Sequence, residues 1–517
     1  MALNQLWTRL TGSQEQDSAR TVTIDKDGAV YIAGTTRGNL DGNHNNGSYD
    51  AFITKYDRDG IKIWTRLIGD SSDQGIYSIA SAEDGSICLA GFTGSDALIA
   101  RYSIDGTEQW SRRVGSTRWD AAWSIATSAD GNIYVSGNTE GSFDGQTNGG
   151  LNDGFLTKYD IDGGKIWTKF ISSPYEDHYT DNIALLGDDS VYVGGSTRGI
   201  LDGEANNGGS DAYFTKYNAD GGKQWTRLVG TSADDFGSII KPLDDGSLII
   251  AGSTKSDLNG QSNHGGDDIF ICKFGGDGVL LWTKLIGTSG NDSPVDLTTL
   301  GNIIYLAGNT NGSFPGQVNQ GENDCFVLTL DANYDPIEVK QFGTPSDDVI
   351  WDAIVGPSGD LYISGTTLGS IYGQSNNGGE DAFLIKFMEG SSGSPPTPPE
   401  ALTPLILQST TASSNQLILN FSDAIKIAGG KAIAPNLLTV TVDGQTRQIT
   451  DTQVDPANAN QLVIMLSGAS LVSASSVSVT YNAPTASVTT GFLTDASGSK
   501  LDAIANQAIT TYSSNTD

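Results

Sequence analysis

Residues 30–67 read VYIAGTTRGNLDGNHNNGSYDAFITKYDRDGIKIWTRL, and the order of motifs in this stretch returns along most of the chain. The small-Gly-x-Thr motif recurs as AGTT, AGFT, SGNT, GGST, AGST, AGNT and SGTT, with its glycine at positions 34, 91, 137, 195, 252, 308 and 365. The spacing is 56 to 58 residues, except for one interval of 46. Each unit carries four strand-like runs, and such a period is typical of the blades of a β-propeller.

The two ends of the repeat array complement each other. An outer-strand run, LWTRLTG, opens the chain at residues 6–12 without a preceding blade, and the seventh unit stops after its third run, DAFLIKFM, at 381–388. Pairing of the first run with the last unit completes that blade and removes exposed strand edges. The sequence therefore predicts an all-β fold that contains a seven-bladed β-propeller closed by the N-terminal strand.

Composition narrows the class of partner. The chain has 517 residues and a formal net charge of −32, from 61 acidic against 29 basic residues. This charge opposes binding to nucleic acid or to an anionic membrane surface. Cys88, Cys272 and Cys325 lie in apolar runs without metal-ligand spacing, so we expect core thiols. The sequence shows neither a signal peptide nor an apolar run of about 20 residues, so an extracellular or cell-surface location requires another export route.

The units resemble the bacterial SBBP β-propeller repeat, in which a Trp strand, a D-G hairpin, an AG-x-T strand and a DAF-x-KYD strand follow one another. The resemblance covers residues 4–388. It implies a propeller of the extracellular or surface type, and it transfers no catalytic residue to this chain.

A change of composition marks a second domain. A Gly/Ser/Pro-rich linker at 391–402 separates the propeller at 1–390 from residues 403–517, where seven short strand-like runs predict an Ig-like β-sandwich. The strings NFSDAI, TVTVDG, SVTYNAP and TDASGSKLDAIANQAI resemble the SWM-type repeat of cyanobacterial motility and haemagglutinin-like surface proteins. The resemblance implies a bacterial surface protein.

The connection between the second and third strands carries oxygen-rich side chains at fixed spacing. In six units it runs 16 positions from the motif glycine to an aspartate, with an asparagine five residues before that aspartate, whereas the second unit has lost this loop. The pattern predicts either calcium sites, which need six to eight oxygens, or Asx turns that cap loop amides. The residue nine positions before the aspartate is aspartate or asparagine in four loops, but it is Pro315 and Tyr372 in the other two. A metal ligand would not be replaced by proline, so this variation favours capping. The calcium alternative assigns Asp41, Asn45, Asp50, Asp144, Asn148, Asp153, Asp202, Asn206 and Asp211.

A second set of aspartates stands where the innermost strands begin, at 17, 73, 120, 177, 234, 292 and 348. We interpret this set either as a ring of negative potential around the channel or as turn aspartates that bind local amides. Nearby aromatic residues suit stacking on sugar rings, although packing between blades accounts equally for Trp123 and Trp351, which are equivalent in the repeat. The predicted ligand site consists of Trp119, Trp123, Tyr175, Tyr179, Trp351, Asp120 and Asp177.

Three classes of function remain open. The first is a secreted or surface-exposed binding and adhesion module, whose long-loop face binds a glycan or a protein. The second is a structural component, such as a fibre or tip of an extracellular or phage-like assembly. The third is a glycan-active enzyme, because paired carboxylates hydrolyse glycosides, but no nucleophile elbow, metal triad or phosphate loop is legible. We therefore expect a non-enzymatic protein whose one candidate cofactor is calcium.

Overall fold

A computed structural model describes residues 3–173, 177–243, 245–301 and 303–389, and short segments beyond residue 406. The chain divides into two compact units, Met1–Pro395 and Pro396–Asp517. The predicted linker at 391–402 lies outside the described residues. Every regular element that the structure describes is a β-strand, and this part of the chain contains no helix suited to crossing a membrane.

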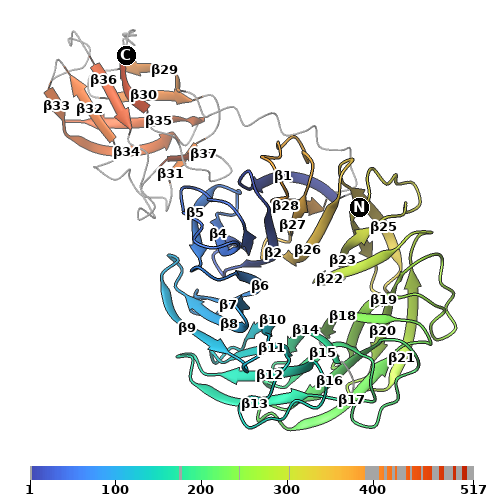
Figure 1. Cartoon of the computed structure of the whole chain (residues 1–517). Helices are drawn as coiled ribbons and strands as arrows, with labels where there is room; N and C mark the ends of the chain where they lie inside the picture. The colour runs from blue at the N-terminus through green and yellow to red at the C-terminus, as the bar shows by residue number, and fades with distance from the viewer. Residues whose placement is uncertain are drawn as a thin grey trace. The chain divides into compact units, whose positions relative to one another are not determined.

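Seven four-stranded antiparallel sheets make up the first unit, and each is one blade of a propeller (Figure 1). In blades 1 to 6 the strands follow in chain order, from the innermost strand at the channel to the outermost strand. Blades 1 to 3 consist of β2 (Asp17–Ile24), β3 (Val30–Thr36), β4 (Asp50–Tyr56), β5 (Lys62–Ile68); β6 (Gln74–Ser81), β7 (Ile87–Thr93), β8 (Asp96–Tyr102), β9 (Glu108–Val114); and β10 (Asp120–Thr127), β11 (Ile133–Thr139), β12 (Asp153–Tyr159), β13 (Lys165–Ile171).

The remaining blades repeat the same pattern. Blades 4 to 6 consist of β14 (Asp177–Leu185), β15 (Val191–Thr197), β16 (Asp211–Tyr217), β17 (Lys223–Val229); β18 (Asp235–Pro242), β19 (Leu248–Thr254), β20 (Asp268–Phe274), β21 (Leu280–Ile286); and β22 (Asp292–Leu300), β23 (Ile303–Thr310), β24 (Asp324–Leu330), β25 (Pro336–Phe342). Blade 7 has β26 (Asp348–Val355), β27 (Leu361–Thr367) and β28 (Asp381–Glu389), with β1 (Leu3–Thr11) as its outermost strand.

The amino-terminal strand closes the ring, as the sequence predicted. β1 pairs antiparallel with β28, from Leu3 opposite Glu389 to Thr11 opposite Ala382. β2 of blade 1 then contacts β26 and β27 of blade 7, so the first and last blades are neighbours. Closure in this way leaves no blade of the ring without its fourth strand.

A Trp-x-Arg motif in four of the seven outermost strands explains how neighbouring blades are held together there. Trp7 of blade 7 lies against Gly60, in the turn between the third and fourth strands of blade 1. The Arg9 guanidinium donates from Nε to the Gly60 carbonyl oxygen at 2.6 Å. Arg112 and Arg227 donate in the same way to Gly163 and Gly278, at 3.1 Å and 3.0 Å. In these three strands the motif therefore joins the outer strand to the hairpin turn of the next blade.

The second and third strands of the blades form the core, because neighbouring blades cover both of their faces. In β11, β12 and β24, every residue is buried. Cys88 in β7, Cys272 in β20 and Cys325 in β24 are buried, which confirms the prediction that they are core residues. Burial raises the pKa of the Cys88 and Cys272 thiols to about 12.

The described part of the second unit is also antiparallel β-structure. One sheet has the order β29-β30-β35-β34, another has the order β33-β32-β36-β38, and β31 pairs with β37. The all-β prediction is confirmed, and an immunoglobulin-like topology stays a prediction. The strands are β29 (Leu407–Ala412), β30 (Gln416–Phe421), β31 (Ile425–Ile427), β32 (Leu438–Val442), β33 (Gln445–Arg447), β34 (Ile449–Asp455), β35 (Asn458–Leu466), β36 (Val477–Tyr481), β37 (Leu493–Asp495) and β38 (Ile504–Ala508).

Candidate functional site

Two sets of loops meet on one face of the propeller. The loop between the second and third strands of one blade ends beside the start of the innermost strand of the next blade. Backbone hydrogen bonds join them, including Gln74 N to Tyr49 O at 2.8 Å and Asp120 N to Ser95 O at 2.8 Å. We call this the loop face. The tight hairpin turns between the other strands lie at the opposite ends of the strands.

The innermost strands carry a β-bulge at the same position in consecutive blades. The register shifts at Arg20 in β2, at Tyr77 in β6, at Trp123 in β10 and at Trp351 in β26. A bulge inserts one extra residue and redirects its side chain. These four residues come from blades 7, 1, 2 and 3 in ring order, and each lies three positions after the start of its strand.

The bulge residues contact one another across the blade boundaries. The Arg20 guanidinium lies over the Trp351 ring at 3.8 Å, and Tyr77 stacks on Trp123 with ring centroids 4.1 Å apart. Trp119, which directly precedes β10, lies 6.3 Å from Trp123. Trp351 keeps 36% of its surface exposed. We call this set, Trp351, Arg20, Tyr77, Trp123 and Trp119, the aromatic arc.

Arg20 sits between the two halves of the arc. Burial lowers the pKa of its guanidinium, and the nearby Tyr77 and Glu380 oppose that shift. Its Nε is buried and has no acceptor among the residues that the structure describes. The arc therefore combines aromatic rings with a buried hydrogen-bond donor.

The predicted aromatic site is only partly assembled. The structure brings Trp119 and Trp123 together and joins Trp351 to the same arc through Arg20. Tyr175 lies outside the described residues, as do the side chains of Asp177 and Tyr179. Sequence reasoning missed Arg20 and Tyr77. Their signal was available, because both stand at the repeat position that Trp123 and Trp351 share.

Asp120, which the sequence predicts to bind a ligand, lies inside its turn and not at the surface of the loop face. Asp120 is fully buried, and its Oδ2 accepts hydrogen bonds from the amide and hydroxyl of Ser116 at 2.7 Å and 3.1 Å. Asp17, Asp292 and Asp348 are buried and capped in the same way by Ser13, Thr288 and Thr344. These are the turn aspartates of the second interpretation, and they do not form an exposed ring.

Two members of that aspartate set were also assigned one position too early. β6 begins at Gln74 and β18 begins at Asp235. Asp73 and Asp234, which precede these strands, instead accept hydrogen bonds from the backbone amides of Tyr49 and Ser210 at 3.2 Å and 3.1 Å. They tie the end of one loop to the next blade.

The loop residues assigned to calcium serve three separate local roles. Asp41 forms an ion pair with Lys62 at 2.7 Å and accepts a hydrogen bond from Thr65 at 2.5 Å. The Asn45 side chain donates to Thr36 O at 3.0 Å and accepts from Gly47 N at 3.0 Å, which is an Asx turn. Asp50 accepts from Asn46 N at 3.0 Å. The contacts are those of the capping alternative.

The other two assigned loops repeat these contacts. Asp144 forms an ion pair with Lys165, and Asp202 forms one with Lys223. The side chains of Asn148 and Asn206 accept hydrogen bonds from the amides of Gly150 and Gly208. Asp153 and Asp211 accept hydrogen bonds from the amides of Gly149 and Asn207. Within the described residues, no group of three or more His, Cys, Asp or Glu side chains is arranged to hold a metal ion. Calcium binding stays an untested prediction.

The ion pair explains why the first aspartate of the loop varies between blades. Where the loop has aspartate, the residue 21 positions later is a lysine, as in Asp41 and Lys62. Blade 5 has Asn259 with Leu280, and blade 6 has Pro315 with Pro336. Charge at one position thus accompanies charge at the other, as expected for partners in an ion pair.

Two carboxylates line the channel between blades 6, 7 and 1. Asp352 accepts hydrogen bonds from Thr21 Oγ1 and Val22 N, both at 2.9 Å. Burial, together with the charge of Asp296, raises the pKa of Asp352. Burial also raises the pKa of Asp296, against the opposing charge of Lys241. Deprotonation of both therefore places two like charges in a poorly solvated channel.

This pair predicts a pH-dependent effect of Asp296→Asn. Because the folded protein binds these protons more tightly than the unfolded chain, their stabilising contribution is present below the ordinary carboxyl pKa of about 3.9. This stabilising contribution is lost as the pH rises through the raised pKa values of Asp296 and Asp352. We expect Asp296→Asn to raise the free energy of unfolding at pH 8 by on the order of 1 kcal/mol, and to change it little at pH 4.5. Urea unfolding at both pH values measures the effect.

The control for this experiment is Asp188→Asn. Hydrogen bonds from Ser190 lower the pKa of Asp188, so its replacement brings no gain at pH 8. An Asp296→Asn protein whose stability changes equally at both pH values would contradict the proposed repulsion.

Both units match known repeat families. Residues 6–41 match the SBBP beta-propeller repeat, and residues 399–486 match the SWM repeat, described as a putative flagellar system-associated repeat. The Regulatory protein FlaEY of Caulobacter vibrioides is 29% identical over 188 residues, which are 32% of this chain and 19% of that protein. The chain thus spans about a fifth of the length of the curated relative that it matches.

Solved structures that are similar to this chain match it at low sequence identity. The Pan2 WD40 domain of Neurospora crassa is 10% identical, with a TM-score of 0.44, over 75% of this chain and 96% of that one. The polysaccharide lyase Uly1 is 13% identical, with a TM-score of 0.39, over 71% of this chain and 89% of that one. The resemblances inferred from the sequence are confirmed by the family matches. The first unit thus contains a segment that matches the SBBP beta-propeller repeat, and the second contains a segment that matches the SWM repeat.

Proposed function

We propose that the propeller is a non-catalytic binding module and that the aromatic arc is its site for a carbohydrate. One observation carries this proposal. Four consecutive blades place an aromatic ring or a guanidinium at the same bulge, on the loop face of the ring. A single functional surface that spans several blades suits an extended ligand better than a small molecule.

The chemistry of the arc fits a neutral glycan. Sugar rings present C–H faces that pack on aromatic side chains, and their hydroxyl groups need hydrogen-bond donors and acceptors. Trp351 and Trp119 supply accessible ring surface at the two ends of the arc. Arg20 lies between them, and its buried Nε has no acceptor among the described residues, so a rotation of this side chain would offer a donor to a ligand. The packing of Tyr77 on Trp123 fixes the rings in place, which reduces the entropy lost on binding.

The second unit supports a wider role in a bacterial surface assembly. It matches a repeat described as a putative flagellar system-associated repeat, and part of the chain is similar to the Regulatory protein FlaEY. We propose that the second unit attaches the chain to such an assembly while the propeller displays its loop face. This proposal joins the adhesion and structural functions expected from the sequence, and it places the protein at the cell surface.

A glycan array tests the carbohydrate proposal, with the full chain as the probe. We expect Trp119→Ala to weaken binding to any glycan hit several-fold, because an aromatic contact contributes about 0.5–1.5 kcal/mol. Trp123→Ala is expected to weaken it more, since Trp123 also supports Tyr77. Isothermal titration measures both affinities.

Trp110→Ala is the matched control. Trp110 lies on β9, the outermost strand of blade 2, away from the channel. The Trp110→Ala substitution should reduce the stability of the propeller and leave its glycan affinity unchanged. Glycan binding that survives replacement of Trp119 and Trp123 together would reject the arc as the site.

A further inference from the structure

The six long loops of the propeller share an apolar anchor. In blade 1, Leu40 precedes a two-residue turn and is bonded across it to Asn43. Asp41 and Gly42 in this turn have the positive φ angles, 51° and 80°, of a type I′ turn. Leu40 is buried against Phe52 and Leu67 of its own blade. Four other loops place Phe143, Leu201, Leu258 and Ile371 in the same way. In blade 6, Phe314 is also buried, but Pro315 follows it and its ring excludes the positive φ of this turn.

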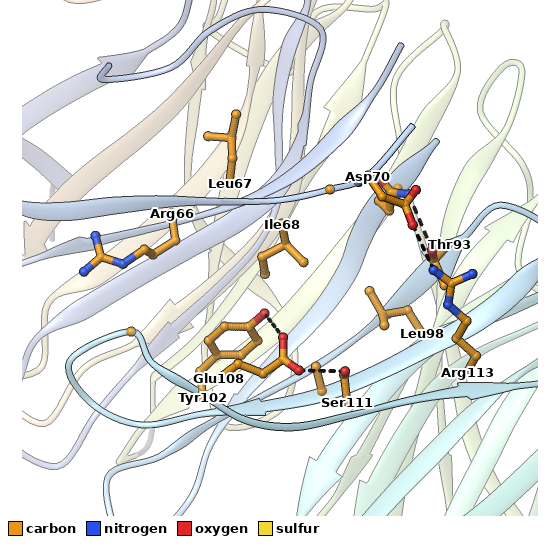
Figure 2. A pocket seen from close by; sticks show the side chains of 14 residues that line it. Arg66, Leu67, Ile68, Asp70, Thr93, Leu98, Tyr102, Glu108, Ser111 and Arg113 are labelled. Carbon is orange, nitrogen blue, oxygen red and sulfur yellow. Dashed lines mark hydrogen bonds and ion pairs between the residues drawn. The ribbon is translucent and has the colours of Figure 1, made fainter. Parts of the chain in front are cut away.

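Blade 2 lacks this loop and has a pocket in its place. β7 and β8 are joined by Gly94 and Ser95 alone. The pocket has a volume of about 500 Å³ and is lined by β8 and β9 of blade 2 and by the end of β5 of blade 1 (Figure 2).

Register shows that the pocket is the position of the missing loop. In blade 1, the loop covers Phe52, Tyr56 and Leu67 and bonds to Lys62 and Thr65. The pairing of β4 with β5 and of β8 with β9 makes the equivalent residues of blade 2 Leu98, Tyr102, Arg113, Glu108 and Ser111. All five line the pocket, and Figure 2 shows them around the same space.

The pocket has an apolar side and two charged sides. Leu98, Ala100 and Ile68 supply the apolar wall. Glu108 stands where Lys62 binds the loop aspartate of blade 1, and it accepts hydrogen bonds from Tyr102 at 3.1 Å and Ser111 at 2.7 Å. Arg113 pairs with Asp70 across the blade boundary at 3.0 Å. The side chain that would pair with the second residue of the turn is therefore negative in blade 2, whereas it is positive in blade 1.

We propose that this pocket is a docking site for a tight turn of a partner protein, which inserts a large apolar side chain followed directly by lysine or arginine. The apolar residue takes the place that Leu40 has in blade 1, on Leu98 and Ala100. The basic residue pairs with Glu108, as Asp41 pairs with Lys62. The six long loops of a second copy do not supply the turn, because they are bound to their own blades.

A peptide selection tests the proposal. A phage-displayed library of disulfide-closed random peptides is panned on the full chain. Counter-selection uses a filled-pocket variant, in which Gly94 and Ser95 are replaced by a copy of residues 37–49 with lysine at the turn aspartate. We expect enriched peptides to share an apolar residue followed by lysine or arginine. Their affinity should fall at least tenfold in Ser111→Trp, because Ser111 is an exposed residue that lines the pocket.

The charge is tested separately by Glu108→Lys. This variant should shift selection from basic to acidic residues at the second turn position, as Lys62 does within blade 1. Melting curves confirm that each variant is folded, and the filled-pocket variant should be at least as stable as the natural chain. The filled-pocket variant should still bind glycan at the aromatic arc, so this experiment distinguishes the docking proposal from the carbohydrate proposal. The proposal would be overturned if no selected peptide lost affinity for the filled-pocket variant. It would also be overturned if Glu108→Lys left the selected residues unchanged.

Discussion

Deletion of residues 1–12 is expected to cost the propeller more than about 5 kcal/mol of stability and to make it associate. The deletion removes the fourth strand of blade 7 and exposes the backbone edge of β28. It also removes Leu3, which is buried in the core of blades 6 and 7. The Arg9 contact with Gly60, which joins blade 7 to blade 1, is lost as well. Urea denaturation and size-exclusion chromatography measure the two effects.

A rearranged chain provides the control for this deletion. Residues 4–12 are moved to follow Phe387, connected by a copy of the Asp57–Gly60 turn, which joins the equivalent strands in blade 1. Because the same strand then pairs with β28 as a hairpin, stability should return to near that of the natural chain. A deletion variant that stays monomeric, with an unchanged denaturation midpoint, would show that β1 is not needed for closure.

The repeat made the architecture predictable from sequence. Strand alternation and turn residues act locally, so seven units with the same local pattern predict seven equivalent blades. The closing strand followed from the incomplete unit at each end of the array. The Asn of each loop was also interpretable, because an Asx turn depends on residues two positions apart, as in Asn45 and Gly47.

The parts that could not be predicted depend on contacts between blades. A bulge shifts the register by one residue, and two-residue alternation gives no sign of it, so the contacts of Arg20 and Tyr77 across the blade boundaries could not be predicted, although their repeat position was readable. The pairing of Asp41 with Lys62 requires the register of two strands. In each case the decisive neighbour is distant in the chain.

Gly34→Ala is expected to be among the most damaging single substitutions, at about 3 kcal/mol or more. A Cβ on Gly34 would lie 1.8 Å from the carbonyl oxygen of Ser18 and 3.0 Å from the amide nitrogen of Arg20. Both atoms belong to the backbone of the bulged strand β2, so neither can rotate away. The motif glycine is thus needed because the bulge brings the innermost strand against its Cα. Urea denaturation measures the loss of stability.

The same substitution should also disturb the aromatic arc, because Arg20 is the bulge residue that lies over Trp351. Glycan affinity measured well below the denaturation midpoint should therefore fall together with stability. The control is Gly187→Ala. No atom lies within 4 Å of its added Cβ, and its φ is not in the left-handed region. That variant is expected to stay within about 1 kcal/mol of the natural chain, with unchanged glycan affinity. A Gly34→Ala protein with the natural denaturation midpoint would mean that β2 can withdraw from β3 at little cost. The bulge would then not be the reason for the recurrent glycine.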